Sequence, residues 1–370
     1  MNPRKRKLKK KQTTSDYKIR NQIHSKRIHK RKLISKKKKK RKRKNLQGLS
    51  KFEREKQYSL KIKHKDYVKI KAPSNFSFIN NREMFSLFIK KLNTQYEKRK
   101  KVYIQLDNIE TVSYGAIVVL LSIMVKFKVA NIGFNGSFPV DYDSKKIITQ
   151  SGFFEYLYKK IKNEERYSIH PKANTIHTHA WKDVDSELGA KIVEDASLTI
   201  WGEKRRCQGV QRALIELMQN TNNHAEIGTE GEKHWWLSVN HIKEEQKVSF
   251  SFIDFGVGIF NNLDNKPKTS KFFGWKKKLS EVFNYQNNVE LLELILDGKM
   301  HKTVTNKNYR GKGLPGIKEV MRRNQISNLH IITNDVYCNA ETNEYSKLSN
   351  SFSGTFVYWE LNNQNVSCRG

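Results

Sequence analysis

Positive charge is concentrated at one end of this chain, and the asymmetry limits what that end can fold into. Residues 1–65 contain 29 lysines and arginines but only three acidic residues, so they carry +26 of the total net charge of +36. Like charges at this density repel one another, and the few apolar side chains cannot offset the entropy lost on ordering. We therefore predict a low-complexity basic tail at 1–65 that is disordered in isolation.

The composition of the tail indicates what it binds. Lysines are dense and aromatic residues are nearly absent, which favours non-specific contact with the phosphate backbone of nucleic acid, DNA or RNA, through counterion release. An acidic membrane surface is a second candidate partner, weakened by the lack of a bulky apolar face or a lipidation motif, and simple solubilisation is a third. No helix-turn-helix or zinc-finger motif indicates a sequence-specific reader.

The remaining 305 residues carry a net charge of only +10 and have the composition of globular protein. Their longest apolar run, 114–125, is shorter than the roughly 20 residues that span a bilayer, so we expect a buried helix and no transmembrane segment. Cys207, Cys338 and Cys368 are far apart and odd in number, which argues against a disulfide framework or a cysteine zinc site. No apolar segment follows the basic amino terminus, so we expect no secretory signal and a cytoplasmic protein.

Strand-like and helix-like segments alternate after the tail, which predicts the α/β fold class. We expect a small α/β domain at 66–165, a linker or loop at about 160–185 where no period is visible, and a second α/β domain at 185–365. The expected strands are 67–71, 102–106, 131–135, 235–242, 248–253, 329–333 and 355–361, and the expected helices are 82–98, 113–125, 144–151 and 208–224.

Three polar residues lie on one side of the predicted helix at 208–224. Glu216, Asn220 and His224 are spaced i, i+4 and i+8, so they line one face. A carboxylate can orient an attacking water or hydroxyl, an amide oxygen one turn later can hold Mg²⁺, and a histidine can reach a phosphate oxygen. Taken alone, the same spacing is also typical of an amphipathic helix with solvated polar residues.

Two further segments have the composition of ligand-binding turns. Asp254 ends a predicted strand and is followed by Gly256 and Gly258, which let the backbone approach a ligand closely, although ordinary strand-to-turn junctions use similar residues. The segment 310–316, Arg-Gly-Lys-Gly-Leu-Pro-Gly, opens a predicted helix whose backbone N–H groups and dipole favour phosphate. A flexible loop before a helix is the plainer alternative there, and Gly354-Thr355 at the start of the last strand says little alone.

The order of these segments is more informative than any one of them. The stretches 216–225, 254–258, 311–316 and 354–355 together resemble the N-box and the successive glycine boxes of the GHKL (Bergerat-fold, histidine kinase-like) ATPase superfamily. That superfamily includes gyrase-type topoisomerases, histidine kinases and anti-sigma serine kinases. The resemblance covers about 185–365 and implies a Bergerat-type α/β sandwich, with helices on one face of a mixed sheet, that binds ATP and Mg²⁺.

The resemblance also implies a role for each matching residue. Glu216 would be the general base, Asn220 the Mg²⁺ ligand, and His224 a phosphate contact. Asp254 would bind the adenine amine with support from Thr355 through water, while Gly256 and Gly258 would pass under the base. The box made of Gly311, Lys312, Gly313, Leu314 and Gly316 would close over the phosphates. The stretch between Gly258 and Gly311 would be the ATP lid, and it contains an apolar, helix-like part at 291–296.

The segment 104–116 is weakly similar to STAS-type domains, in which a strand–loop–helix of this form presents a phosphorylatable serine. Ser113 is the nearest hydroxyl and Thr111 is close by, but a helix N-cap at Ser113 is the simpler interpretation. STAS-type and anti-sigma-like ATPase domains are known partners, so their fusion in one chain would be coherent.

Three functions fit these features. The first, which we favour, is a Mg²⁺-dependent ATP hydrolase whose nucleotide-driven lid and dimer switch acts on nucleic acid held by the tail. The second is an anti-sigma-like serine or histidine protein kinase, and the third is an ATP-sensing module with little turnover. A conventional sensor histidine kinase is disfavoured because no phosphoacceptor helix is evident. A homodimer and a protein partner are both compatible with this class.

Overall fold

The computed structural model describes residues 64–158, 167–168, 174–179, 186–224, 235–254, 256, 258–260, 285–299 and 313–366. The chain divides into two compact units, Met1–Lys65 and Asp66–Gly370, and nearly all described residues belong to the second. The predicted basic tail lies outside the described residues, apart from His64 and Lys65. None of the described helices is long and apolar enough to cross a membrane.

The first part of the second unit is built on three parallel strands. They are β1 (Val68–Lys71), β3 (Val102–Gln105) and β5 (Phe134–Gly136), hydrogen-bonded in the order β1-β3-β5. A short parallel pair, β2 (Asn75–Phe76) with β4 (Thr111–Val112), stands apart from this sheet. The helices are α3 (Arg82–Glu97), α4 (Tyr114–Val129), α5 (Tyr142–Gln150) and α6 (Phe153–Tyr158). Strands β1 and β3 and helices α3, α4 and α5 agree with the expected elements, whereas β5 begins three residues later than expected and β2, β4 and α6 were not predicted.

The N-terminus of α4 shows how a local sequence signal sets a helix start. The Ser113 side chain accepts a hydrogen bond from the backbone N–H of Ala116 at 3.2 Å, so Ser113 is the N-cap of α4. The helix that follows is apolar on nearly all sides and almost completely buried, because other elements cover it on several sides. The simpler interpretation of Ser113, as a helix cap, is therefore confirmed.

The second part of the unit is a six-stranded sheet in the order β10-β11-β9-β8-β7-β6. Its strands are β6 (Tyr167–Ser168), β7 (Asn174–His179), β8 (Trp235–Ile242), β9 (Lys247–Asp254), β10 (Ser327–Asn339) and β11 (Glu344–Asn362). Every pairing in this sheet is antiparallel, which differs from the expected mixed sheet. The short connections from β8 to β9 and from β10 to β11 produce antiparallel hairpins.

The prediction of a linker or loop at 160–185 is wrong for part of that segment. Strand β7 pairs with β8 along its whole length, from Asn174 opposite Asn240 to His179 opposite Trp235, and β6 pairs with β7. The sequence of β7, Asn-Thr-Ile-His-Thr-His, is too polar to give a strong strand signal. Pairing with an already buried strand supplies what the local sequence does not.

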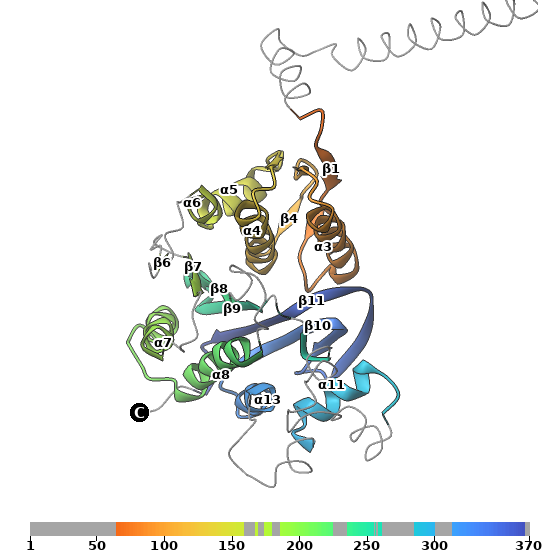
Figure 1. Cartoon of the computed structure of the whole chain (residues 1–370). Helices are drawn as coiled ribbons and strands as arrows, with labels where there is room; N and C mark the ends of the chain where they lie inside the picture. Colours follow the sequence, from red (N-terminus) through yellow and green to blue (C-terminus); the bar gives the residue numbers. More distant parts are fainter. Residues whose placement is uncertain are drawn as a thin grey trace, which may run out of the picture. The chain divides into compact units, whose positions relative to one another are not determined.

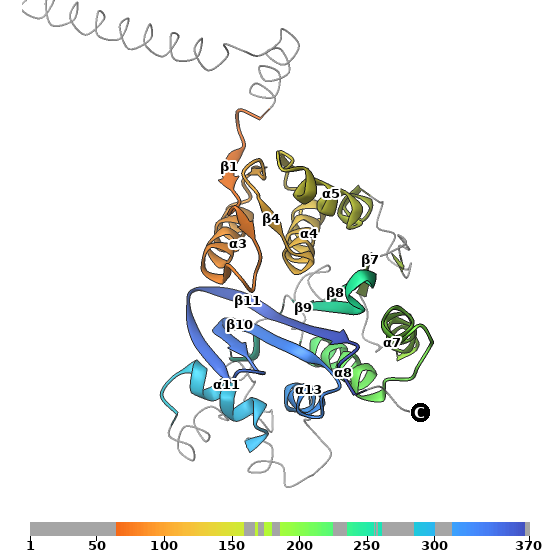
Figure 2. The ribbon, with the colours of Figure 1, turned by 180° about the vertical axis from the view of Figure 1, so that it is seen from behind.

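Alternation along the strands gives the sheet two buried faces. Trp235, Phe252 and Val357 point to one hydrophobic core, and their neighbours in sequence, Trp236, Ile253 and Phe356, point to the other. The first face is covered by α7 (Ser186–Trp201), α8 (Gln208–His224), α11 (Asn288–Leu296) and α13 (Gly313–Arg322). Helices α3 and α4 cover the second face, and Figures 1 and 2 show the sheet between these two groups of helices.

Helix α4 approaches the second face of the sheet at a glycine. A Cβ atom added at Gly115 would lie 2.9 Å from the Phe356 ring and 3.0 Å from Ser251 Oγ, so only glycine fits here without movement of the sheet. Phe78, in the turn before α3, adds an aromatic contact, because its ring lies 5.1 Å from both Phe352 and Phe356. The two regions that the sequence predicts as separate domains therefore share one hydrophobic core.

The described cysteines are in two different states. Cys338 on β10 is a free, buried thiol, and burial raises its pKa to about 12. Cys207, just before α8, is disulfide-bonded, which differs from the expectation that the cysteines stay reduced.

Candidate functional site

Asp254 is the last residue of β9. Among the described acids at strand ends, its carboxyl group has the pKa that departs most from the ordinary value. It pairs with Trp235 on one side and Thr355 on the other, and Thr355 in turn pairs with Thr333 of β10. Burial raises the pKa of the Asp254 carboxyl group to about 6, although a hydrogen bond from the Gly256 backbone N–H acts in the opposite direction. A carboxylate kept in such surroundings is more typical of a binding site than of a stabilising contact.

The two glycines after Asp254 are required by close approaches. A Cβ atom on Gly256 would lie 3.1 Å from an Asp254 carboxyl oxygen. Gly258 has φ +75, and a Cβ atom there would meet the Asn334 side-chain amide at 2.3–2.6 Å. Both glycines therefore keep the turn in contact with its neighbours, and Gly258 also supplies a left-handed backbone conformation.

Two residues of β10 hold this turn in place, and sequence analysis did not identify either. Thr333 Oγ1 accepts a hydrogen bond from Ile259 N at 3.2 Å and donates one to the Gly354 carbonyl oxygen at 3.1 Å. Asn334 Oδ1 accepts from Phe260 N at 3.2 Å. Both side chains are buried, and the strand register shifts at Asn334. The signal available in the sequence was Thr-Asn-Asp at the end of a predicted strand, a weak turn pattern.

Thr355, predicted from the last of the four segments, lies beside Asp254 in the sheet. Its Oγ1 atom is 3.4 Å from Thr333 Oγ1, so the two hydroxyl groups and the Asp254 carboxyl group belong to one row across three neighbouring strands. The structure thus brings together Asp254, Gly256, Gly258 and Thr355, and adds Thr333 and Asn334 to them.

Glu216 lies near the middle of α8, partly exposed, with 21% of its side chain accessible. Its carboxylate is 3.7 Å from the Arg212 guanidinium one turn earlier, a surface pair of small energetic weight. Asn220 and His224 also belong to α8, so their Cα positions follow Glu216 on one side of the helix, but their side chains lie outside the described part of the structure.

Helix α13 begins within the glycine-rich segment, at Gly313. Gly311 and Lys312 lie outside the described residues. Leu314 is buried in the first hydrophobic core, and that core also contains Met218 of α8 and Phe260 just beyond Gly258. Three of the four segments singled out in the sequence therefore pack around the same core, on the first face of the sheet.

The predicted lid is described at 259–260 and at 285–299, and the second of these stretches contains α11. Leu291, Leu292 and Leu296 of this helix are fully buried in the first core, so α11 is an integral part of the fold and not a detached flap. At its end, Asp297 accepts hydrogen bonds from Lys318 Nζ at 3.0 Å and from Arg322 at 3.1 Å. Burial opposes ionisation of Asp297, but Lys318 and Lys299 lower its pKa overall.

The described residues contain no group of three or more His, Cys, Asp or Glu side chains that could hold a metal ion. The side chain of Asn220, the predicted Mg²⁺ ligand, lies outside the described part of the structure. Chemically, the site offers an acceptor carboxylate at Asp254, two hydroxyl groups, and close-approaching glycine backbone.

No protein-family model matches this chain, and no significant match was found among curated proteins or solved structures.

Proposed function

We propose that this protein is an ATP-binding protein of the GHKL class with a Bergerat-type nucleotide domain, and that it hydrolyses ATP with Mg²⁺. The observation that carries the proposal is the desolvated carboxyl group of Asp254, a partly buried residue at the end of β9 that adjoins Gly256, Gly258 and Thr355. These four residues occupy positions that correspond, in order and type, to the adenine-binding part of that class.

Asp254 would select the base. When ionised, its carboxylate accepts hydrogen bonds, and the exocyclic amine of adenine is a donor, whereas guanine presents a carbonyl oxygen at the equivalent place. Because the carboxyl group is desolvated, leaving it without a ligand donor is unfavourable, and this strengthens discrimination between the two bases. Thr355 and Thr333 would supply further hydroxyl groups for a bridging water.

Glu216 would act at the other end of the nucleotide. Its partly exposed carboxylate would accept a proton from the attacking water, and the start of α13 would place backbone N–H groups toward the phosphates. Mg²⁺, when bound, would neutralise phosphate charge. His224, Gly311, Lys312, Gly313 and Gly316 keep the phosphate-end roles that the resemblance implies, and nucleic acid held by residues 1–65 remains part of the proposal.

Two other functions stay as alternatives. A serine or histidine protein kinase would use Glu216 to activate a hydroxyl or imidazole of a partner protein, and an ATP sensor would bind nucleotide with little turnover. The buried position of α11 favours neither, but it means that any lid movement that includes α11 must break the contacts of Asp297 with Lys318 and Arg322.

Calorimetric titration of ATP and GTP with Mg²⁺, together with phosphate release, tests the proposal. We expect wild type to bind ATP in preference to GTP, Asp254→Asn to lose that preference, and Glu216→Gln to bind ATP but lose turnover by at least about 100-fold. Glu194→Gln is the matched control and should resemble wild type, because Glu194 is an exposed acid of α7 that pairs with Lys204.

The outcomes separate the three functions. Binding without turnover in wild type would favour a kinase awaiting its substrate or a sensor, and ATP-dependent labelling of an added partner would identify the kinase. Failure of wild type to bind any nucleotide would overturn the assignment to this class.

A further inference from the structure

A cluster of basic residues lies on the folded unit, away from residues 1–65. Lys98, Arg99, Lys100 and Lys101 form the turn between α3 and β3, and all four side chains are exposed. Lys126 in the last turn of α4 joins them, because Lys126 Nζ lies 5.1 Å from the Tyr96 ring and Arg99 donates to the Ala130 carbonyl oxygen at 3.0 Å. Lys128 Nζ instead donates to the Leu157 carbonyl oxygen at 2.6 Å. We call the five residues Lys98, Arg99, Lys100, Lys101 and Lys126 the basic pole.

The pole lies at one end of the three-stranded sheet, where its parallel strands begin. Val68 N donates to the Lys101 carbonyl oxygen at 2.8 Å, and Val102 N donates to the Gly133 carbonyl oxygen at 3.1 Å. Since the strands are parallel, these contacts place the starts of β1, β3 and β5 together at this end of the sheet. The only nearby acids in sequence are Asp66 and Glu97, so the five cations of the pole and these two carboxylates leave a net charge of +3.

The cations of the turn are not neutralised by carboxylates of the fold. Within the described part of the chain, none of Lys98, Arg99, Lys100 and Lys101 forms an ion pair, whereas Lys204, Lys247 and Lys318 each pair with a carboxylate. Attraction to a helix C-terminus accounts for Lys98 and Lys126, since cations there are favoured by the helix dipole. It does not account for Lys100 and Lys101, which follow the helix.

Arg99 is the most informative residue of the turn. It has φ +48, a left-handed conformation that terminates α3 and that usually employs glycine or asparagine. An arginine there costs about 1 kcal/mol relative to glycine, and α4 ends in the same manner with Asn131, which has φ +53. The charge at this position is kept despite an unfavourable backbone.

We propose that the basic pole binds the phosphate backbone of nucleic acid, as a second contact surface on the folded unit in addition to residues 1–65. This inference rests on the nucleic-acid part of the proposed function. Lys101 Nζ lies 6.0 Å from the ring of Tyr67, the second residue of the folded unit, so the chain enters this unit at the pole. A polyanion bound by the covalently attached tail is therefore held at high effective concentration near these cations.

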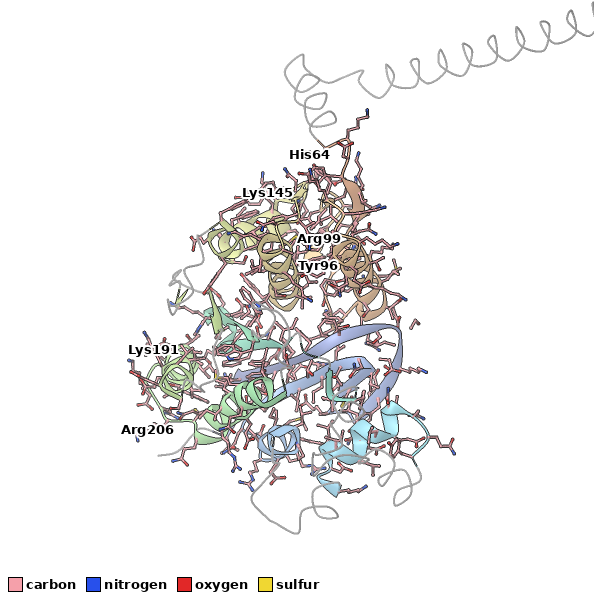
Figure 3. All side chains as sticks on the ribbon, in the orientation of Figure 1. His64, Tyr96, Arg99, Lys145, Lys191 and Arg206 are labelled. Atoms are coloured by element: carbon pink, nitrogen blue, oxygen red, sulfur yellow. The ribbon has the colours of Figure 1, made fainter. Side chains whose placement is uncertain are left out.

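Lysine footprinting on the full chain tests this directly. The exposed lysines are acylated with and without a 30-base-pair duplex of arbitrary sequence, and the modified sites are quantified by mass spectrometry. We expect at least threefold protection of Lys98, Lys100 and Lys101. Lys145 and Lys146 on α5 are the matched control, because α5 follows the opposite end of the sheet. At that end the strands finish, and Val140 N donates to the carbonyl oxygen of Asp107, just after β3. Figure 3 labels Arg99 and Lys145 on their separate elements.

Matched charge variants give a second measurement. Lys100→Gln/Lys101→Gln should reduce the slope of log affinity against log salt by about 2, since each lost phosphate contact removes about 0.9. Lys145→Gln/Lys146→Gln removes the same charge and should leave the slope unchanged. Arg99→Gly removes a charge but relieves the backbone, so it should weaken binding while leaving the fold as stable as wild type or more so.

Each outcome has a separate meaning. Protection of tail lysines without protection of the pole would overturn this inference and leave the role of the tail standing. Absence of protection anywhere would contradict the nucleic-acid role as a whole. Equal protection of the control lysines, or protection of the pole by phosphatidylserine vesicles but not by DNA, would also overturn it.

Discussion

At the scale of single residues, the site depends on groups that are unfavourable for stability. Asp254 carries a carboxyl group that burial keeps difficult to ionise, and Gly258 adopts φ +75 against the Asn334 amide. Neither feature would be needed to connect β9 to the following segment, because an amide and an ordinary turn would suffice. Unfavourable local features of this kind are expected where binding requires them.

Replacing Asp254 by Asn should make stability less dependent on pH. The folded-state pKa of about 6 is raised above the ordinary value of 3.8, so this group stabilises the fold below pH 3.8 and loses that contribution as pH rises through 6. Between pH 5 and 8 the loss is about 1 kcal/mol. Urea unfolding of both proteins at the two pH values measures it, and an identical change in wild type and Asp254→Asn would contradict the prediction.

The same group predicts how nucleotide binding depends on pH. Only the ionised carboxylate accepts a hydrogen bond from the adenine amine, so ATP affinity of wild type should fall about fourfold between pH 7.5 and 5.5. Asp254→Asn should bind weakly at both pH values.

Gly258→Ala should lower the free energy of unfolding by about 2–4 kcal/mol, because it adds a collision with Asn334 to the left-handed backbone. Gly202→Ala is the matched control: it has φ +76 but no atom within 4 Å of the added Cβ, so it should cost only about 1 kcal/mol. Equal losses in thermal or urea unfolding would show that the contact with Asn334 is unimportant.

At the scale of helices and strands, α11 and α13 are joined by a buried lysine. The side chain of Lys318 is only 4% exposed. Its Nζ donates to Asp297 Oδ1 and, at 3.3 Å, to the Tyr345 hydroxyl. The contact connects the described part of the predicted lid to the helix that opens with the glycine-rich segment. Movement of one helix is therefore linked to the position of the other.

Lys318→Ala should lower the free energy of unfolding by about 2–3 kcal/mol, since it leaves the Asp297 carboxylate with weaker, exposed partners. Hydrogen exchange should become faster at the α11 amides. Arg323→Ala, which removes an exposed pair with Glu319 on the same helix, should change stability by less than about 0.5 kcal/mol. Unchanged exchange in α11 after Lys318→Ala would contradict the proposed linkage.

At the scale of the whole folded unit, strands β8 and β9 of the six-stranded sheet are buried on both faces along nearly their whole length. Helices α3 and α4 cover the face behind Asp254, and Phe356, next to Thr355 in sequence, lies directly under Gly115. The ion pair of Arg82 with Glu344, at 3.2 Å, adds a polar contact between the same regions. The parallel three-stranded part and the sheet should therefore unfold together.

Leu92→Ala in α3 tests this. Leu92 is fully buried, and its truncation should cost about 3 kcal/mol. All six tryptophans lie at residue 181 or later, so none belongs to α3. Trp236 faces the core that contains Leu92, so both proteins carry Trp236→Phe, and the remaining described tryptophans of the sheet, Trp235 and Trp359, face the other core. We expect the fluorescence-detected urea midpoint to fall. A midpoint equal to that of wild type would mean that the two regions unfold independently. Val129→Ala, at a half-exposed position, is the control.

The sequence by itself determined the features that depend on neighbours in the chain. The period of α8, the N-cap at Ser113, and the strand ending at Asp254 with glycines after it all follow from local propensity and turn chemistry. These features place Glu216 on a helix and Asp254 at a strand end. Reading them required no knowledge of which elements meet.

Only the tertiary structure decided the features that depend on pairing between distant segments. Thr333 and Asn334 join the site because β10 places them beside Gly258, some 75 residues earlier in the chain. Strand β7 forms because β8 is available to pair with it. Helices α3 and α4 cover one face of the six-stranded sheet, and the sequence did not predict this contact. Register and sheet order arise from long-range packing, which a local pattern does not encode.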